Sequence, residues 1–155
     1  MRALDFVPYF WNERDGQKIS SHLVALRVQP VYKKIVGAVL NSSLFYWFFV
    51  IHSNGRDLVK REIENFPLSM EKIPVTLVKK LEEIFDDLMK DYKRNAERKK
   101  CYYKTTGKVE YDEFQPGLSK KIIDILDDYL AEYYGFSDEE KNFIKNFDSD
   151  IRTKR

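Results

Sequence analysis

The sequence is poor in the residues that most active sites require: it has one cysteine, two histidines and six glycines that all stand singly. Cys101 forms no disulfide within the chain, which favours a reducing compartment such as the cytoplasm. One cysteine and two histidines are too few for a zinc cluster, so we expect no metal site. Single glycines do not form a loop that holds phosphate groups. Common nucleotide-binding and metal-dependent sites are therefore not predicted.

Catalytic motifs are scarce as well. The chain has no Gly-x-Ser-x-Gly nucleophile motif. No base or ligand is placed beside His22, His52 or Cys101 by the sequence, so ordinary half-buried side chains are the simpler interpretation. Three acidic pairs are adjacent in the sequence and do not face each other on a helix, which predicts solvated surface: 86–87, 127–128 and 139–140. The chain by itself is not expected to be an enzyme.

Long apolar runs are also missing. The longest, residues 44–51, is much shorter than the roughly 20 residues that cross a bilayer. Charged residues make up 34% of the chain and the mean hydropathy is −0.53, so an integral membrane protein is not expected. Hydrophobic residues still make up 43%, which is enough for one folded domain, or one domain and a small appendage.

The most unusual segment present is residues 40–49, where three polar residues interrupt an apolar stretch and five aromatic residues follow. Aromatic side chains at this density must pack against other parts of the protein. Asn41 or Ser42 can accept a hydrogen bond from the first turn of a helix, which predicts a helix over residues 43–52 after another over 32–40. A buried strand over residues 44–51 is the alternative, because aromatic residues favour strands.

The rest of the chain predicts an α+β fold that is mainly α, with a small N-terminal β portion, a long amphipathic helix and a C-terminal helical pair. The N-terminal part has an edge strand or extended piece at 4–12, a turn at 15–16 and a strand at 21–28. A turn at 54–55, a short helix at 57–63 and an extended stretch at 66–68 follow. We place a boundary after residue 70, between residues 1–70 and a helical region at 71–155.

The long helix is predicted over residues 74–100 because apolar residues recur at spacings of three and four. This apolar seam consists of Val78, Leu81, Phe85, Leu88 and Tyr92. A loop or small hairpin is expected at 101–118. Ser119 and Gly135 can then begin and end a helix over 119–134. A capping box between Ser137 and Glu140 predicts a last helix over 137–146.

Charge is segregated along the chain. Residues 90–108 carry eight Lys or Arg against two Asp or Glu, whereas residues 109–150 carry four against twelve. A basic band of this density is a candidate for contacts with phosphate groups. The neighbouring acidic block is the alternative partner of this band within the chain, which would make the band ordinary surface.

Three blocks of sequence, taken together, resemble one family. The first is Pro8-Tyr9-Phe10-Trp11-Asn12 with residues 20–23. The second is Leu40-Asn41-Ser42-Ser43-Leu44-Phe45-Tyr46-Trp47, continued by residues 54–58 and 63–68. The third comprises residues 123–124, 130–136, 139–140, 143–144 and 147–148. In this order, they resemble the C-terminal end of large Type II (IIG-like) restriction-modification DNA methyltransferases that modify the amino group of adenine.

The resemblance implies a target-recognition, or specificity, region that reads DNA sequence. Family members bind S-adenosylmethionine in a separate catalytic domain with an Asn-Pro-Pro-Tyr-type motif that grips the adenine. No Asn of this chain is followed by Pro, and the cofactor-binding glycine motif is missing. The chain therefore corresponds to the specificity part without the catalytic domain, and carries no cofactor itself. Expected partners are double-stranded DNA and the methyltransferase catalytic domain or subunit.

Two groups of basic residues are candidates for contacts with DNA phosphates. The first group is Lys33, Lys34, Arg56, Lys60 and Arg61, and the second is Lys93, Arg94, Arg98, Lys99 and Lys100. The alternative function is a non-enzymatic interaction module, in which the apolar seam of the long helix docks on a catalytic subunit or on a second copy of the chain.

Overall fold

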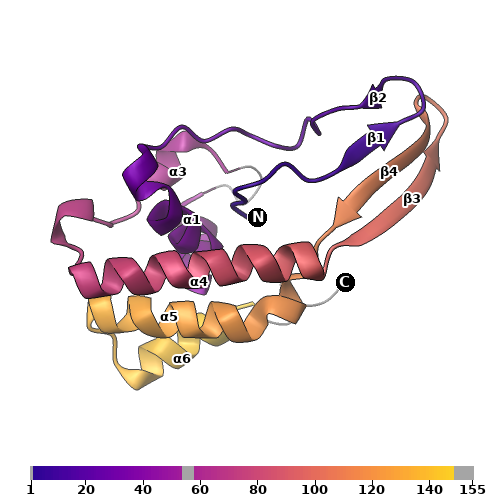
Figure 1. Cartoon of the computed structure of the whole chain (residues 1–155). Coiled ribbons are helices and arrows are strands. Elements are labelled where there is room, and N and C mark those ends of the chain that lie inside the picture. Colours follow the sequence, from indigo (N-terminus) through magenta and orange to yellow (C-terminus); the bar gives the residue numbers. More distant parts are fainter. Residues whose placement is uncertain (1, 54–57, 149–155) are drawn as a thin grey trace.

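The computed structural model describes residues 2–53 and 58–148, and its fold is α+β and mainly α, as expected. The predicted turn at 54–55 and Arg56 lie outside the described residues. Figure 1 shows a helical body and a small antiparallel sheet that projects from one end of it. The division after residue 70 is not reflected in the packing, because one hydrophobic core combines residues from before and after it.

The aromatic segment forms the helix that its polar residues predicted. Helix α1 (Lys33–Asn41) is followed directly by α2 (Ser43–His52), and Ser42 between them accepts a hydrogen bond at 3.0 Å from the backbone N–H of Phe45. The alternative strand over 44–51 is wrong. The helical conformation is favoured because it buries one face of α2, including Phe45 and Phe49, in the core.

No single helix among the described residues is long and apolar enough to cross a membrane. Residues 30–41 and α2 pass that test only as a pair of helices bent by 72°.

Helix α4 (Val75–Arg94) lies across the body between α1 and α5, but it is shorter than predicted. The prediction carried this helix to residue 100. Instead it ends at Arg94, and strand β3 (Glu97–Tyr103) begins three residues later. The apolar seam ends at Tyr92, so a further helical turn would have no apolar side chains to bury. The adjacent Tyr102 and Tyr103 also favour a strand.

The C-terminal helical pair is confirmed. Helix α5 (Lys120–Tyr134) ends at Gly135, which has the left-handed φ of 69° typical of a helix stop. Helix α6 (Asp138–Asn146) begins with the predicted capping box between Ser137 and Glu140. In α6, Ile144 is buried whereas Phe143 is 56% exposed.

The sheet has the strand order β2-β1-β4-β3 and every pairing is antiparallel. Strands β1 (Phe10–Asn12) and β2 (Gly16–Gln17) form a short hairpin, and β3 and β4 (Gly107–Glu113) form a longer one. The region at 101–118 is therefore largely a hairpin rather than a loop. The predicted strand at 21–28 is wrong: residues 21–22 form a turn, residues 23–28 have no regular secondary structure, and residues 26–28 border α1 and α3.

Short elements complete the body. Helix α3 (Lys60–Glu64) is the short helix expected at 57–63. Three single turns of 3-10 helix precede α1, α4 and α5: η1 (Pro30–Tyr32), η2 (Met70–Lys72) and η3 (Pro116–Ser119). Ser119 is the residue before α5, as expected, but its hydroxyl donates to Asp91 of α4 at 2.6 Å rather than capping its own helix.

Candidate nucleic-acid interface

The candidate phosphate-binding residues fall into two separate regions of the molecule. Lys33 and Lys34 begin α1, and Lys60 and Arg61 begin α3, beside α1 in the body. The second group lies at the C-terminal end of the long helix and beyond it: Lys93 and Arg94 close α4, and Arg98, Lys99 and Lys100 belong to β3. The two groups do not form one continuous basic surface along a single element.

Most of the first group is engaged within the chain. Lys34 Nζ lies 2.6 Å from Asp86 on α4, and this contact raises the pKa of Lys34. Lys60 Nζ pairs with Glu64 at 3.0 Å. Arg61 pairs at 3.1 Å with Glu62, whose carboxylate is buried and accepts from the backbone N–H of Val59. These contacts tie α1 to α4 and stabilise α3.

The two cations at the end of α4 also support the fold. Lys93 Nζ lies 4.5 Å from the centre of the Phe6 ring. Arg94 pairs with Asp91, a buried carboxylate that also accepts from Ser119. Removing a cation from a buried carboxylate is costly, so Arg94 is better explained by Asp91 than by DNA.

The cations of β3 differ, because they lie on the projecting sheet. Alternation along the strands places one set of side chains on the face that carries Trp11, which we name the Trp11 face. Its residues are Tyr9, Trp11, Arg98, Lys100, Tyr102, Lys108, Glu110 and Asp112. Lys99, Cys101, Tyr103 and Tyr111 lie on the opposite face. The Trp11 face thus combines aromatic rings with charges of both signs.

The outer half of the β3–β4 hairpin is the most basic part of the sheet. Residues 100–108 contain three lysines, Lys100, Lys104 and Lys108, and no Asp or Glu. Tyr102 is 76% exposed and Tyr103 is 55% exposed, and they point to opposite faces. Lys108 Nζ pairs with Glu110 at 2.6 Å, and this raises the pKa of Lys108. The Lys108 side chain is 50% exposed in this pair, so a phosphate group can approach it from solvent.

A hollow of about 660 Å³ lies at the inner end of the sheet. It is lined by Val7, Pro8, Tyr9, Gln17, Lys18, Ile19 and Asp112. Arg98 lies over the Tyr9 ring at 3.6 Å from its centre and donates from Nε to Asp112 at 2.7 Å. Asp112 in turn accepts from the Tyr9 backbone N–H at 3.1 Å. Tyr9 is therefore held by both its backbone and its ring.

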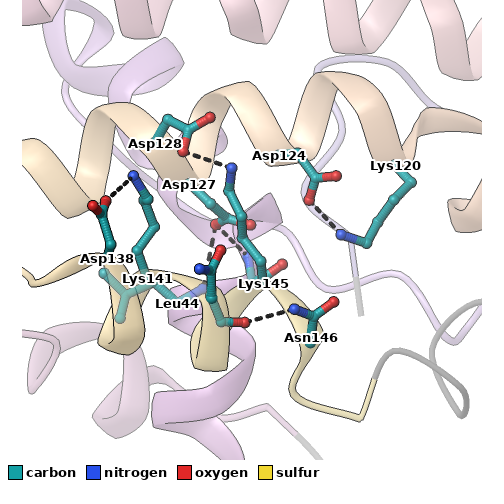
Figure 2. A network of polar contacts seen from close by, with 11 residues as sticks. Leu44, Lys120, Asp124, Asp127, Asp128, Asp138, Lys141, Lys145 and Asn146 are labelled. Carbon is teal, nitrogen blue, oxygen red and sulfur yellow. Dashed lines mark hydrogen bonds and ion pairs between the residues drawn. The ribbon is translucent and has the colours of Figure 1, made fainter.

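One buried carboxylate was missed by the sequence interpretation. Asp127 is 3% exposed and accepts hydrogen bonds from the backbone N–H groups of Ser43, at 2.8 Å, and Leu44, at 3.4 Å. Figure 2 shows this carboxylate aimed at the start of α2, while Asp128 turns the other way to Lys145. Solvated surface was thus the wrong expectation for Asp127. A usable signal existed, because Asp127 lies four residues after Ile123 and three before Leu130, within the apolar stripe of α5.

The seam of the long helix is part of the core. Leu81, Phe85, Leu88 and Tyr92 are at most 2% exposed, and Val78 is partly buried against the same core. These side chains pack on α1 and α5 of their own chain, which counts against the hypothesis that the seam docks on a partner or a second copy.

Comparisons of the chain with protein-family models, curated proteins and solved structures gave no match.

Proposed function

We propose that this chain is a DNA-binding specificity module and that the outer half of the β3–β4 hairpin is its contact surface. The observation that carries the proposal is the composition of that half: three lysines and two exposed tyrosines without an acidic residue, on a hairpin that projects from the body. Lysines supply the salt-dependent attraction to phosphates. Tyrosines supply flat rings for contacts with bases.

The hairpin projects from the body, so it can approach duplex DNA. A two-stranded ribbon enters the major groove, which is about 12 Å wide, and proteins use such ribbons to read base edges. Lys100, Lys104 and Lys108 would contact the phosphates that border the groove and fix the position of the ribbon. Tyr102 and Tyr103 point to opposite faces of the ribbon, so one of them faces the floor of the groove when the other faces outward.

The parent system that we propose follows from the sequence resemblance. The chain would be the specificity part of a Type II restriction-modification adenine methyltransferase and would act in the cytoplasm. Catalysis and S-adenosylmethionine binding would belong to a catalytic domain or subunit, because this chain lacks both motifs. Of the ten basic candidates, Lys100 retains the strongest support, because it lies in the outer half of the hairpin and 3.9 Å from Glu110, whereas Arg98 pairs with Asp112 at 2.7 Å and Lys99 with Glu97 at 2.6 Å.

Binding of a labelled duplex of mixed sequence, followed by fluorescence anisotropy at several salt concentrations, tests the proposal. Replacing Lys100, Lys104 and Lys108 by Gln is expected to lower the slope of log affinity against log salt by about 2.7, the value for three phosphate contacts. The matched control replaces Lys72, Lys79 and Lys90, which are exposed on the body, and is expected to leave the slope unchanged. No binding at about 50 mM salt, or an equal loss in both triple variants, contradicts the proposal.

A further inference from the structure

We infer that the hollow at the inner end of the sheet binds one nucleotide with an unpaired base. The site lies on the Trp11 face but uses none of the three hairpin lysines. It goes beyond the proposed function, because duplex DNA offers paired bases whose faces are covered by their neighbours. Single-stranded nucleic acid and free mononucleotides share the required chemistry, which is an exposed base face joined to a phosphate.

The lining of the hollow matches the parts of a nucleotide. Val7 and Ile19 are 61% and 63% exposed, so two large apolar side chains border the hollow without being buried by the chain. With Tyr9 they offer an apolar and aromatic surface for the flat face of a base. Stacking on aromatic side chains is how proteins hold unpaired bases with little preference for sequence.

Polar groups at the rim supply the other contacts. Gln17 is exposed, and its amide carries both a donor and an acceptor, the combination that pairs with the edge of adenine. Lys18 pairs with the carboxylate of Asp15 at 2.6 Å and can exchange that ion pair for a phosphate. The hollow is wide and open to solvent.

The principal contact is preorganised. The Tyr9 backbone exchanges two hydrogen bonds with Asp112, since the N–H donates to the carboxylate and the carbonyl accepts from the Asp112 N–H at 3.1 Å. Arg98 lies over the ring and is itself held by the second carboxylate oxygen. Tyr9 therefore loses little conformational freedom when a base stacks on it, and this favours binding.

Tryptophan fluorescence of the full chain tests the site. The chain has two tryptophans, and Trp47→Phe leaves Trp11, which pairs with Gln17 across β1 and β2, as the reporter. Titration with a single-stranded eight-nucleotide oligonucleotide is expected to quench Trp11. Tyr9→Leu in this background keeps an apolar side chain and is expected to weaken binding about tenfold or more. Trp11→Phe, which leaves Trp47 in the helical body, is expected to show no quenching.

Further variants and ligands distinguish the possible outcomes of this experiment. Gln17→Ala changes an exposed side chain, so it keeps the fold, and is expected to remove any preference for oligo(dA) over oligo(dT). Quenching by adenosine monophosphate that depends on Tyr9 identifies free nucleotides as ligands of the same site. Single-strand binding that survives both Tyr9→Leu and Gln17→Ala, or the lack of any quenching, overturns the inference. The hairpin triple-lysine variant should still be quenched, so failure of duplex binding and failure of this site are distinguished.

Discussion

The charge of Asp127 is expected to be one of the largest single contributions to the stability of the helical body. This buried carboxylate accepts from the first two N–H groups of α2, which carry the positive end of the helix dipole. Asp127→Asn keeps the shape and removes the charge, which costs roughly 1–2 kcal/mol for a partly desolvated charge at a helix terminus. Asp127→Ala also removes the acceptor from the buried N–H groups of Ser43 and Leu44, for a total of roughly 2–4 kcal/mol.

The measurement is urea unfolding at neutral pH, followed by far-ultraviolet circular dichroism. The slope of the unfolding free energy against urea concentration should be the same in all variants, which checks two-state behaviour. Asp128→Asn is the matched control, because Asp128 is the next residue of the same helix. Its pair with Lys145 at 2.5 Å is at the surface, with the Asp128 side chain 46% exposed, so we expect a loss of at most about 1 kcal/mol. If Asp127→Asn is no more destabilising than Asp128→Asn, the capping role of Asp127 is refuted.

Two further predictions concern packing and pH. Gly37→Ala in α1 places a Cβ against Cε2 of the Phe85 ring, so α1 and α4 must separate. We expect the free energy of unfolding to fall by roughly 1–3 kcal/mol in the same urea assay. An unchanged urea midpoint would contradict this packing. Burial raises the pKa of Tyr134 above its usual value near 10, and its hydroxyl donates to the Pro67 carbonyl at 2.9 Å. The unfolded chain therefore loses this proton first, so the free energy of unfolding falls as the pH rises above about 10. In the Tyr134→Phe variant, the free energy of unfolding should fall less steeply between pH 9 and pH 11 than in the wild-type protein. An identical pH dependence in both proteins would contradict this prediction.

Local chemistry made the helix termini predictable. Ser42, the Ser137–Glu140 box and Gly135 each form the cap that their residue types favour, because the interactions involve neighbours in the sequence. The apolar seam of α4 was also identified correctly as a seam. The elements that pack on this seam were not identified, because periodicity shows that a helix face is buried but not which element covers it.

The errors arose where distant residues decide the structure. The start of β3 depends on its pairing with β4, and β4 pairs in turn with β1, which joins Phe10 to Tyr111 across the sheet. Residues 21–28 have strand-like composition but no strand beside them. The apolar stripe of α5 indicates that Asp127 is buried, but not what it binds, because its donors at the start of α2 are 84 residues earlier in the chain. For the candidate interface, the sequence identified β3 cations but not the hairpin that presents them or the hollow beside Tyr9.

The long separation between Asp127 and the helix that it caps has a consequence for biosynthesis. Helix α2 leaves the ribosome while its acceptor, 84 residues later, has still to be translated. At about 5–20 residues per second, that interval lasts roughly 4–17 seconds. During most of it, Phe45, Phe48 and Phe49 lack α5, which begins only at Lys120. The nascent chain therefore exposes an aromatic segment in this interval, and its folding waits for the last third of the chain.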